Sequence, residues 1–150
     1  GNLDIAFNTN DYGTEPTVGR YDGLAGLVLK GGGNGEFKTL SILQSGIFIN
    51  GNGKGLAKIR SGNNNYLMVS TQNRGPVQLF KNKHSVKIIP ASATDMFAIF
   101  TLANGKKQKV ECNYGASFLS QSSRFFSVPG TAKSCSITDA QGKTRNVMLN

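Results

Sequence analysis

Short runs of apolar residues, many of them alternating with polar ones, recur along the whole chain between glycine- and asparagine-rich stretches. Such alternation is typical of half-buried β-strands, whereas strong helical periodicity is absent. A first group of predicted strands covers residues 3–8, 26–30, 37–43, 56–61, 66–71 and 77–81. A second group covers residues 86–89, 96–102, 108–113, 117–122, 124–128, 134–138 and 144–149. We therefore predict an all-β chain of short antiparallel strands.

Two turn segments in the second group predict β-hairpins. Asn104-Gly105 is the residue pair favoured in a two-residue type I′ turn, which requires a positive φ at both positions. Gly142, between Asp139 and Lys143, suits the left-handed position of a bulged hairpin loop. Both glycines are therefore expected to join neighbouring antiparallel strands.

The polar stretch of residues 81–84 divides the chain into two predicted domains, residues 1–82 and residues 85–150. A chain of 150 residues has room for one domain or two small ones. The formal net charge is +9 and is unevenly distributed. Residues 1–36 carry −3, residues 37–84 carry +7, and residues 85–150 carry +5.

The composition argues against several kinds of chemistry. One histidine and two cysteines are too few for a tetrahedral zinc site, which takes about four such ligands. His84 lies in a polar connection, where a solvated side chain is a simpler interpretation than a general base. The eight acidic residues form no adjacent pair, and glycine-rich stretches such as residues 51–55 fit turns better than a phosphate-binding loop. From the absence of a catalytic constellation we predict that the chain is not an enzyme. No apolar run is long enough to span a membrane.

The positive charge favours a polyanion such as RNA as one class of partner. The aromatic residues that would stack on bases instead occupy predicted strand positions, such as Phe97 and Phe126. A solvated basic surface without such a partner is therefore the competing interpretation. The candidate phosphate contacts are Lys54, Lys58, Arg60, Lys106, Lys107 and Lys109.

Cys112 and Cys135 fall in two predicted strands of the second group. If those strands are neighbours, a disulfide is geometrically feasible, and an oxidising compartment would favour it. The alternative is a pair of buried free thiols. The sequence leaves both interpretations open.

A Leu-Ser-Gln-Ser-Ser run at residues 119–123 is followed by a predicted hairpin that ends in Gly142-Lys143. Within residues 105–147, this arrangement resembles the ASPIC/UnbV domain, which is shared with cartilage acidic protein. Residues 126–130 read Phe-Ser-Val-Pro-Gly where that family frequently has Phe-Gly-Leu-Gly. With these changes the sequence resembles a divergent branch of the family, of the kind found in envelope proteins of Bacteroidetes.

A second resemblance lies in the first half of the chain. Residues 1–5 match the tail of an Asp-x-Asp-x-Asp-Gly-x-x-Asp loop, and residues 26–37 and 66–80 match strand segments of the same repeat. The repeat that these stretches resemble is FG-GAP/VCBS, which forms a β-propeller ahead of the ASPIC/UnbV domain. The resemblance implies partial propeller blades over residues 1–82 and a small sandwich- or barrel-like β domain over residues 85–150. It also implies that Asp4 is a remnant of a calcium loop. Since calcium takes six to eight oxygen ligands, we expect no cofactor here and calcium only in the intact repeat region.

The two resemblances together imply a secreted, periplasmic or cell-surface location within a larger parent chain. We expect a non-enzymatic binding module for a protein or glycan ligand, with a basic polyanion- or RNA-binding module as the alternative. The candidate ligand contacts are Ser120, Gln121, Ser122 and Arg124, although the same run also suits a β-turn or a strand edge. Because isolated propeller blades leave strand edges unpaired, self-association through those edges is a further expectation.

Overall fold

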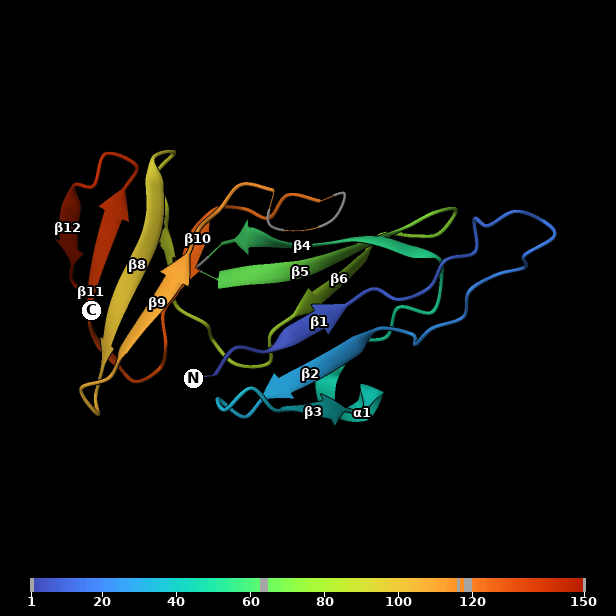
Figure 1. The fold of residues 1–150 in the computed structure, drawn as a ribbon, viewed down its shortest axis with the longest axis horizontal. Coiled ribbons are helices and arrows are strands. Elements are labelled where there is room, and N and C mark those ends of the chain that lie inside the picture. Colours follow the sequence, from blue (N-terminus) through green and yellow to red (C-terminus); the bar gives the residue numbers. More distant parts are fainter. Residues whose placement is uncertain (1, 63–64, 116, 118–119, 150) are drawn as a thin grey trace.

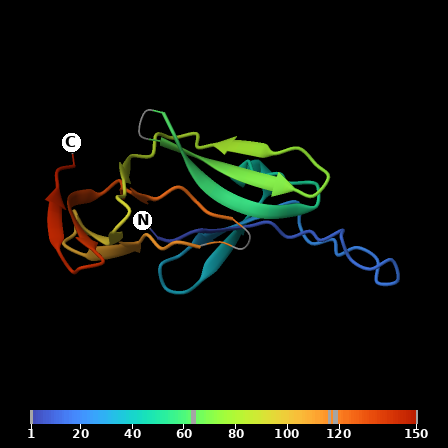
Figure 2. The same ribbon diagram turned by 90° about the horizontal axis from the view of Figure 1, so that it is seen from above.

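The computed structural model describes residues 2–62, 65–115, 117 and 120–149. It confirms the all-β prediction, with 48% strand and 3% helix. The strands form four small antiparallel sheets, none of which closes into a barrel. Figures 1 and 2 show an elongated molecule in which the C-terminal strands lie at one end and the β1–β2 connection at the other. The described residues contain no helix that is long and apolar enough to cross a membrane.

The N-terminal half consists of two sheets, each a meander of three consecutive strands. The first sheet has the order β1-β2-β3, formed by β1 (Ile5–Phe7), β2 (Leu27–Gly31) and β3 (Phe37–Leu40). The second has the order β4-β5-β6, formed by β4 (Gly53–Ser61), β5 (Asn65–Gln72) and β6 (Gln78–Lys81). Meanders of this kind also occur in propeller blades. Two such sheets do not make a propeller, so that assignment stays a prediction.

The strand predicted over residues 37–43 ends at Leu40 because a short helix follows it. Helix α1 (Ile42–Ser45) begins after Ser41, whose side chain accepts the backbone N–H of Gln44. The Gln44 side chain in turn accepts the backbone N–H of Ser41, which completes a capping box. Gly46, with a φ of 70°, ends the helix in the left-handed conformation. Local hydrogen bonding therefore replaces the last part of the predicted strand.

Buried polar and apolar contacts hold the two N-terminal sheets together. The Asn8 amide donates to the carbonyl oxygen of Gly55 (2.9 Å) and to Oγ of Ser70 (3.2 Å). Ser70 is fully buried, so these bonds satisfy a group that water does not reach. Ile49 is also buried, and its N–H donates to the carbonyl oxygen of Ala25. The segment before β4 is thereby fixed against the start of β2.

The C-terminal half has two layers around one apolar core. Its four-stranded sheet has the order β12-β11-β8-β9, formed by β8 (Asp95–Leu102), β9 (Lys107–Glu111), β11 (Ala132–Asp139) and β12 (Thr144–Val147). The second layer is the pair of β7 (Ile88–Pro90) and β10 (Phe125–Ser127). Alternate residues of the strands point into the core, whose buried members are Ala98, Phe100, Cys112, Phe126, Cys135 and Ile137. The arrangement is an open two-layer sandwich rather than a closed barrel.

The two predicted hairpins have the same three-residue loop geometry. Gly142, with a φ of 81°, occupies the left-handed position as predicted, and its N–H donates to the Asp139 carbonyl oxygen. The type I′ prediction for Asn104-Gly105 is wrong, because only Gly105 has a positive φ (78°). The Gly105 N–H donates to the Leu102 carbonyl oxygen, which makes a type I turn with a left-handed glycine behind it. A single glycine is therefore sufficient for each loop.

Among the described residues no strand pairing crosses residues 82–87, and the two halves meet through other contacts. Tyr66 of β5 stacks on Phe125 of β10, with ring centroids 5.2 Å apart. The Ser123 backbone N–H donates to the Lys58 carbonyl oxygen of β4 at 2.7 Å. The C-terminal half is thus docked against one edge of the β4-β5-β6 sheet.

Candidate ligand-binding cleft

The described residues of the serine-rich run predicted to contact a ligand lie along the outer edge of β4. Oγ of Ser122 accepts the backbone N–H of Lys58 at 3.0 Å. Oγ of Ser120 donates to the carbonyl oxygen of Leu56 at 3.1 Å. Backbone groups on the edge of a sheet need partners, and these hydroxyl groups supply them. The positions of Ser120 and Ser122 are therefore explained by the docking of the two halves.

This docking also explains why the strand predicted over residues 117–122 is absent from the sheets. The described part of that segment has one isolated bridge, between Ser117 and Ser120, and residues 118 and 119 lie outside the described residues. Gln121 is used locally, since its Oε1 accepts the Gly115 N–H (2.6 Å) and its Nε2 donates to the Ser122 carbonyl oxygen (2.9 Å). The segment therefore satisfies polar groups without joining a strand ladder.

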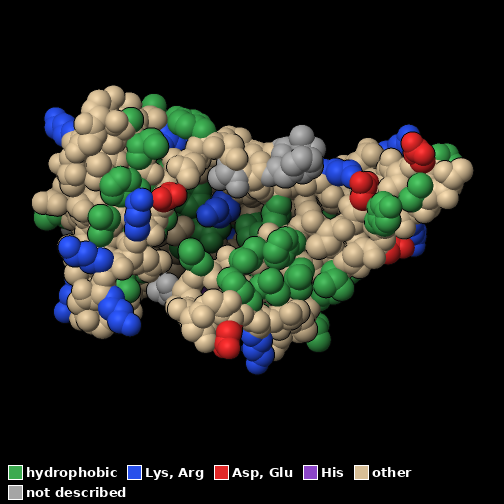
Figure 3. Space-filling model, in the orientation of Figure 1, with side chains coloured by type: hydrophobic (Ala, Val, Ile, Leu, Met, Phe, Trp, Pro, Cys, Tyr) green, Lys and Arg blue, Asp and Glu red, His purple; other side chains and the backbone are tan. Residues whose placement is uncertain are grey.

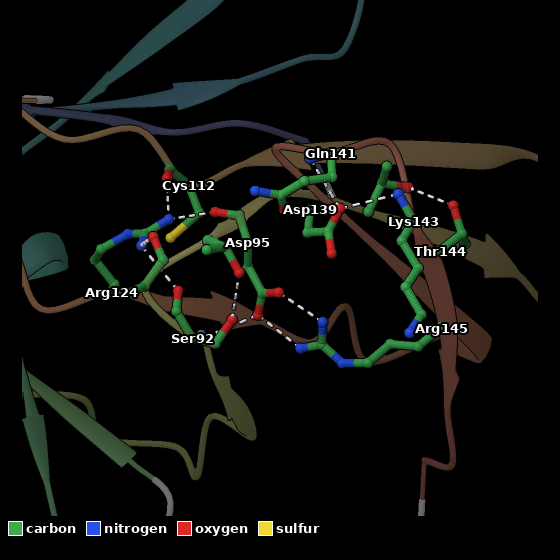
Figure 4. A network of polar contacts seen from close by, with 12 residues as sticks. Ser92, Asp95, Cys112, Arg124, Asp139, Gln141, Lys143, Thr144 and Arg145 are labelled. Carbon is green, nitrogen blue, oxygen red and sulfur yellow. Dashed lines mark hydrogen bonds and ion pairs between the residues drawn. The ribbon is translucent and has the colours of Figure 1, made fainter.

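Arg124, the fourth predicted ligand contact, is occupied by partners within the protein. Its guanidinium carbon lies 4.2 Å from the centroid of the Tyr114 ring, which is within cation–π range. The guanidinium donates hydrogen bonds to the Tyr114 hydroxyl and to the carbonyl oxygens of Ser92, Ala93, Asp95 and Cys112. Figure 4 shows these bonds converging from the turn before β8 and from the end of β9. Arg124 thus fastens two connections of the C-terminal half together.

Asp95 forms the centre of the same polar network (Figure 4). Its carboxylate is fully buried and receives two hydrogen bonds from the Arg145 guanidinium, at 2.5 and 2.6 Å. The Ser92 N–H donates to the same carboxylate at 2.8 Å. The hydrogen bonds from Arg145 hold the pKa of Asp95 well below its usual range, against the opposing effect of burial. The network joins the turn before β8 to β12 through the buried Asp95 carboxylate.

The six basic residues proposed for a polyanion belong to two separate sheets. Lys54, Lys58 and Arg60 lie on β4, whereas Lys106, Lys107 and Lys109 lie in the β8–β9 hairpin. On the face drawn in Figure 3, basic side chains are spread over the C-terminal half, and hydrophobic side chains gather over the N-terminal sheets. The predicted phosphate contacts therefore do not form one surface.

Several of these lysines already have partners. Lys54 forms an ion pair with Asp11 at 2.6 Å, and Lys109 forms one with Glu111 at 2.8 Å. Nζ of Lys58 lies 5.6 Å from the Phe125 ring centroid, at the junction of the two halves. The loss of hydration at this junction lowers the pKa of Lys58. Their charges are therefore only partly available to a partner.

Asp4 and His84 lie apart from any cluster of metal-ligating side chains among the described residues. Oδ1 of Asp4 accepts the Gly31 N–H at 2.9 Å. Where the structure describes the chain, no three side chains of histidine, cysteine, aspartate or glutamate come together as metal ligands would. His84 is exposed in the connection between the halves. The assignment of Asp4 to a calcium-loop remnant therefore stays a prediction from the sequence.

Cys112 and Cys135 are both buried free thiols. Cys135 belongs to β11 and Cys112 follows β9, and β8 lies between these two strands. Strands on either side of a third are separated by about 9–10 Å, whereas a disulfide needs Cα atoms within about 7 Å. This geometry fits the free-thiol alternative.

A polar cleft of about 640 Å³ lies in the N-terminal half. Three segments far apart in the sequence build it: the β1–β2 connection, the loop before β4 and the turn between β5 and β6. Figure 1 shows these segments at the end of the molecule away from the C-terminal half. We call this site the polar cleft; it is lined by Tyr12, Gly13, Thr14, Gly51, Asn52, Gln72, Asn73, Arg74 and Gly75.

Close backbone packing holds the cleft segments together. A Cβ atom at Gly51 would lie 1.8 Å from Oε1 of Gln72, so a larger residue here would displace the Gln72 side chain from its place in the cleft. The Asn73 N–H donates to the Asn52 carbonyl oxygen at 2.9 Å, which ties the β5–β6 turn to the loop before β4. Asn10, which is buried, donates to the Gly51 carbonyl oxygen at 3.1 Å. These bonds connect the three segments that line the cleft.

Asn52 is a buried side chain of the cleft lining with an unpaired acceptor. It is 7% exposed, and its Oδ1 has no hydrogen-bond partner among the described residues. Buried polar atoms are nearly always paired, so this oxygen has the capacity to accept one further hydrogen bond.

Tyr12, by contrast, has its hydroxyl engaged. The Asn10 amide donates to that hydroxyl at 3.1 Å. A hydrogen bond to the Asp22 carboxylate raises the pKa of Tyr12, because the carboxylate disfavours a second negative charge beside it. The Arg20 guanidinium lies 5.1 Å from the centroid of the Tyr12 ring. Tyr12 thus forms a neutral wall of the cleft, held in place by its neighbours.

No protein-family model, curated protein or solved structure matches this chain. The resemblances to FG-GAP/VCBS repeats and to the ASPIC/UnbV domain therefore stay predictions from the sequence.

The residues that line the cleft were not among the candidates from the sequence. Residues 51–55 were noticed for their glycines and assigned to a turn, and residues 72–75 fall between two predicted strands. Gly51-Asn52-Gly53 is an ordinary turn composition, and the burial of Asn52 is visible only in the structure. Nothing local to residues 10–14 indicates that they approach either segment.

Proposed function

We propose that the chain is a non-enzymatic binding module and that the polar cleft binds a glycan. The observation that carries the proposal is Asn52, a buried side chain whose Oδ1 is unpaired among the described residues. A buried acceptor without a partner is unfavourable by about 1–3 kcal/mol, and a hydroxyl group donated by a ligand removes that penalty. Sugar hydroxyls donate and accept hydrogen bonds, as do the amide side chains of Asn52, Gln72 and Asn73.

The dimensions of the cleft favour a glycan over a protein partner. Its volume of about 640 Å³ falls within the range of sites for small ligands. Protein partners usually bind broader surfaces with an apolar centre, whereas this lining is polar apart from the Tyr12 ring and the glycines. A short stretch of sugar units fits such a site better than a folded surface does.

The resemblance to envelope proteins supports a location outside the cytoplasm, in a secreted, periplasmic or cell-surface protein with further domains. Hydroxyl-rich polymers are abundant ligands in that setting. Calcium is expected only where other repeats supply oxygen ligands in addition to Asp4. The unpaired edges of β3 and β6 support self-association as an additional interaction.

A single-stranded polyanion such as RNA is the second candidate ligand, at a different place. Lys107 and Lys109 pair with Thr101 and Ile99 of β8 and therefore share a face of the sheet with Phe97. Nζ of Lys109 lies 4.6 Å from the centroid of the Phe97 ring. An aromatic ring beside basic side chains on an open sheet is a combination that stacks bases and contacts phosphates.

The experiment is a glycan array probed with the full chain, followed by calorimetric titration of each glycan that binds. Asn52→Ala is expected to weaken binding about 5- to 100-fold, the equivalent of the hydrogen-bond penalty, without loss of thermal stability. Asn146→Ala, at an exposed position of β12, is the matched control and should change neither quantity. Unchanged glycan affinity of the Asn52 variant would refute the assignment of the cleft.

Binding of a single-stranded RNA at about 50 and about 200 mM salt separates the two candidates. An affinity that falls by orders of magnitude over this range, and that depends on Lys107 and Lys109 rather than on Asn52, favours the polyanion. A glycan held by neutral side chains is expected to respond weakly to salt.

A further inference from the structure

Arg74 is the one charged side chain among the residues that line the polar cleft. Its guanidinium takes part in no hydrogen bond, ion pair or ring contact within the described residues. Arg124 and Arg145, in the C-terminal half, instead donate to carbonyl or carboxylate oxygens. The guanidinium N–H groups of Arg74 therefore have no acceptor among the described residues of the protein.

The backbone at Arg74 adopts a conformation that side chains other than glycine rarely take. Its φ is 58°, and it is the one residue other than glycine with a positive φ in the described part of the chain. This left-handed conformation is unfavourable for a residue with a Cβ atom, and glycine adopts it freely. A glycine at this position would form the same turn, so the turn does not require an arginine. Strain of this kind is found at positions where a side chain must be presented to a ligand.

The positive charge of Arg74 is not neutralised by its surroundings. The other cations near the cleft are paired, Lys54 with Asp11 and Arg20 with Asp22. Among the described residues, no carboxylate belongs to the cleft lining. The lining consequently combines one unpaired cation, Arg74, with an unpaired amide oxygen, Oδ1 of Asn52.

We infer that the polar cleft binds an acidic glycan, with Arg74 contacting a carboxylate of the sugar and Asn52 accepting a hydroxyl. The inference rests on the proposed function, because it names the ligand class of the same cleft. A guanidinium donates two parallel hydrogen bonds to a carboxylate, and its planar fork fixes the orientation of the sugar. The hydroxyls of the same sugar unit supply the donors that the amide oxygen lacks.

The test compares acidic oligosaccharides with their methyl esters, which keep the hydroxyls and lose the charge. The probes are oligogalacturonate and oligosaccharides that contain glucuronate or sialate, each titrated into the full chain by calorimetry beside its ester. The acid is expected to bind about ten- to a hundredfold more tightly than the ester. Equal affinity for an acid and its ester, or binding confined to neutral glycans, overturns the inference and leaves the proposed function standing. Failure of every glycan to bind overturns both.

Three variants separate a specific contact from general attraction to a positive surface. Arg74→Gln should remove the preference for the acid and leave the affinity for the ester unchanged, and Arg74→Lys should retain part of the preference. Arg60→Gln, on β4 outside the cleft lining, changes the net charge equally and should leave the preference intact. Equal losses from Arg74→Gln and Arg60→Gln would indicate non-specific charge attraction and overturn the inference.

Discussion

Arg145→Gln is expected to destabilise the chain more than Asp95→Asn, although both substitutions break the same ion pair. Asp95 is fully buried, whereas the Arg145 side chain is 46% exposed. Loss of the guanidinium leaves a buried carboxylate whose remaining partner is Ser92. Loss of the carboxylate charge leaves a guanidinium that can turn toward water. The two substitutions therefore leave very different groups without a partner.

The expected magnitudes follow from this asymmetry. Removing one partner of a buried ion pair typically costs about 3–5 kcal/mol, and the half-exposed position of Arg145 places Arg145→Gln near about 3 kcal/mol. Asp95→Asn keeps the side-chain size and the bond from Ser92, so its expected cost is about 1–1.5 kcal/mol. The double variant places two neutral amides opposite each other, and it should be more stable than Arg145→Gln alone.

The effect of Arg145→Gln also depends on pH. The pKa of Asp95 is lowered from its ordinary value of 3.8, chiefly by the hydrogen bonds from Arg145. The ionised carboxylate therefore contributes stability that is fully present above pH 3.8 and is lost as the pH falls below it. Without Arg145 the buried carboxylate is easier to protonate. The stability deficit of the variant should accordingly shrink as the pH is lowered from about 6 to about 3.

Urea unfolding followed by far-UV circular dichroism measures these differences, since the chain contains no tryptophan. The measurements are made on the wild type, both single variants and the double variant at several pH values. A double variant no more stable than Arg145→Gln would refute the reasoning, as would a deficit that stays constant with pH. Either result would mean that burial of the unpaired carboxylate is not the source of the cost.

Three further outcomes are expected. Arg74→Gly should relieve the backbone strain at the positive φ and raise the melting temperature by roughly 2–4 °C, and it should weaken the binding of acidic glycans. A lower melting temperature would contradict the strain argument. Arg124→Gln should cost about 2–4 kcal/mol in urea unfolding, because it removes the donors to the carbonyl oxygens of the buried residues Asp95 and Cys112, and it should leave glycan affinity unchanged under native conditions. Cys112 and Cys135 should react with an alkylating reagent only after unfolding, as judged by mass, because both are buried and burial raises the pKa of the Cys135 thiol. A mass lower by two hydrogen atoms in the unfolded, non-reduced chain, without alkylation, would show a disulfide instead.

Much of the fold could be predicted because strand signals are local. The alternation around Ala98 and Phe100 identified the inward positions of β8, and Gly142 marked its loop correctly. The errors have local and non-local causes. The strand over residues 37–43 was cut short by the capping box that begins at Ser41, a signal that the sequence itself contains. The strand over residues 117–122 was lost to bonds with β4, which lies some 60 residues earlier in the chain.

The candidate site was much harder to predict, since it is made of loops. The β1–β2 connection, the loop before β4 and the β5–β6 turn come together in the polar cleft. Hydrophobic periodicity predicts strands and helices, and it does not predict contacts between loops. Gly51 shows the difficulty, because a glycine in this sequence context predicts a turn and nothing more. In the structure Gly51 lies against the side chain of Gln72 in β5. The sequence around a glycine does not show which other segment of the chain packs against it.

Arg124 and Arg74 show which property separates a structural side chain from a candidate binding one. Both are arginines in polar connections, and the sequence favoured Arg124 because of the motif around it. In the folded chain the two Nη atoms of Arg124 donate to four carbonyl oxygens, and its unpaired Nε is buried. Arg74 has no such partners among the described residues and has a positive φ, and it lines the same cleft as Asn52, whose Oδ1 is likewise unpaired. A ligand therefore gains most where the fold has left polar groups without partners.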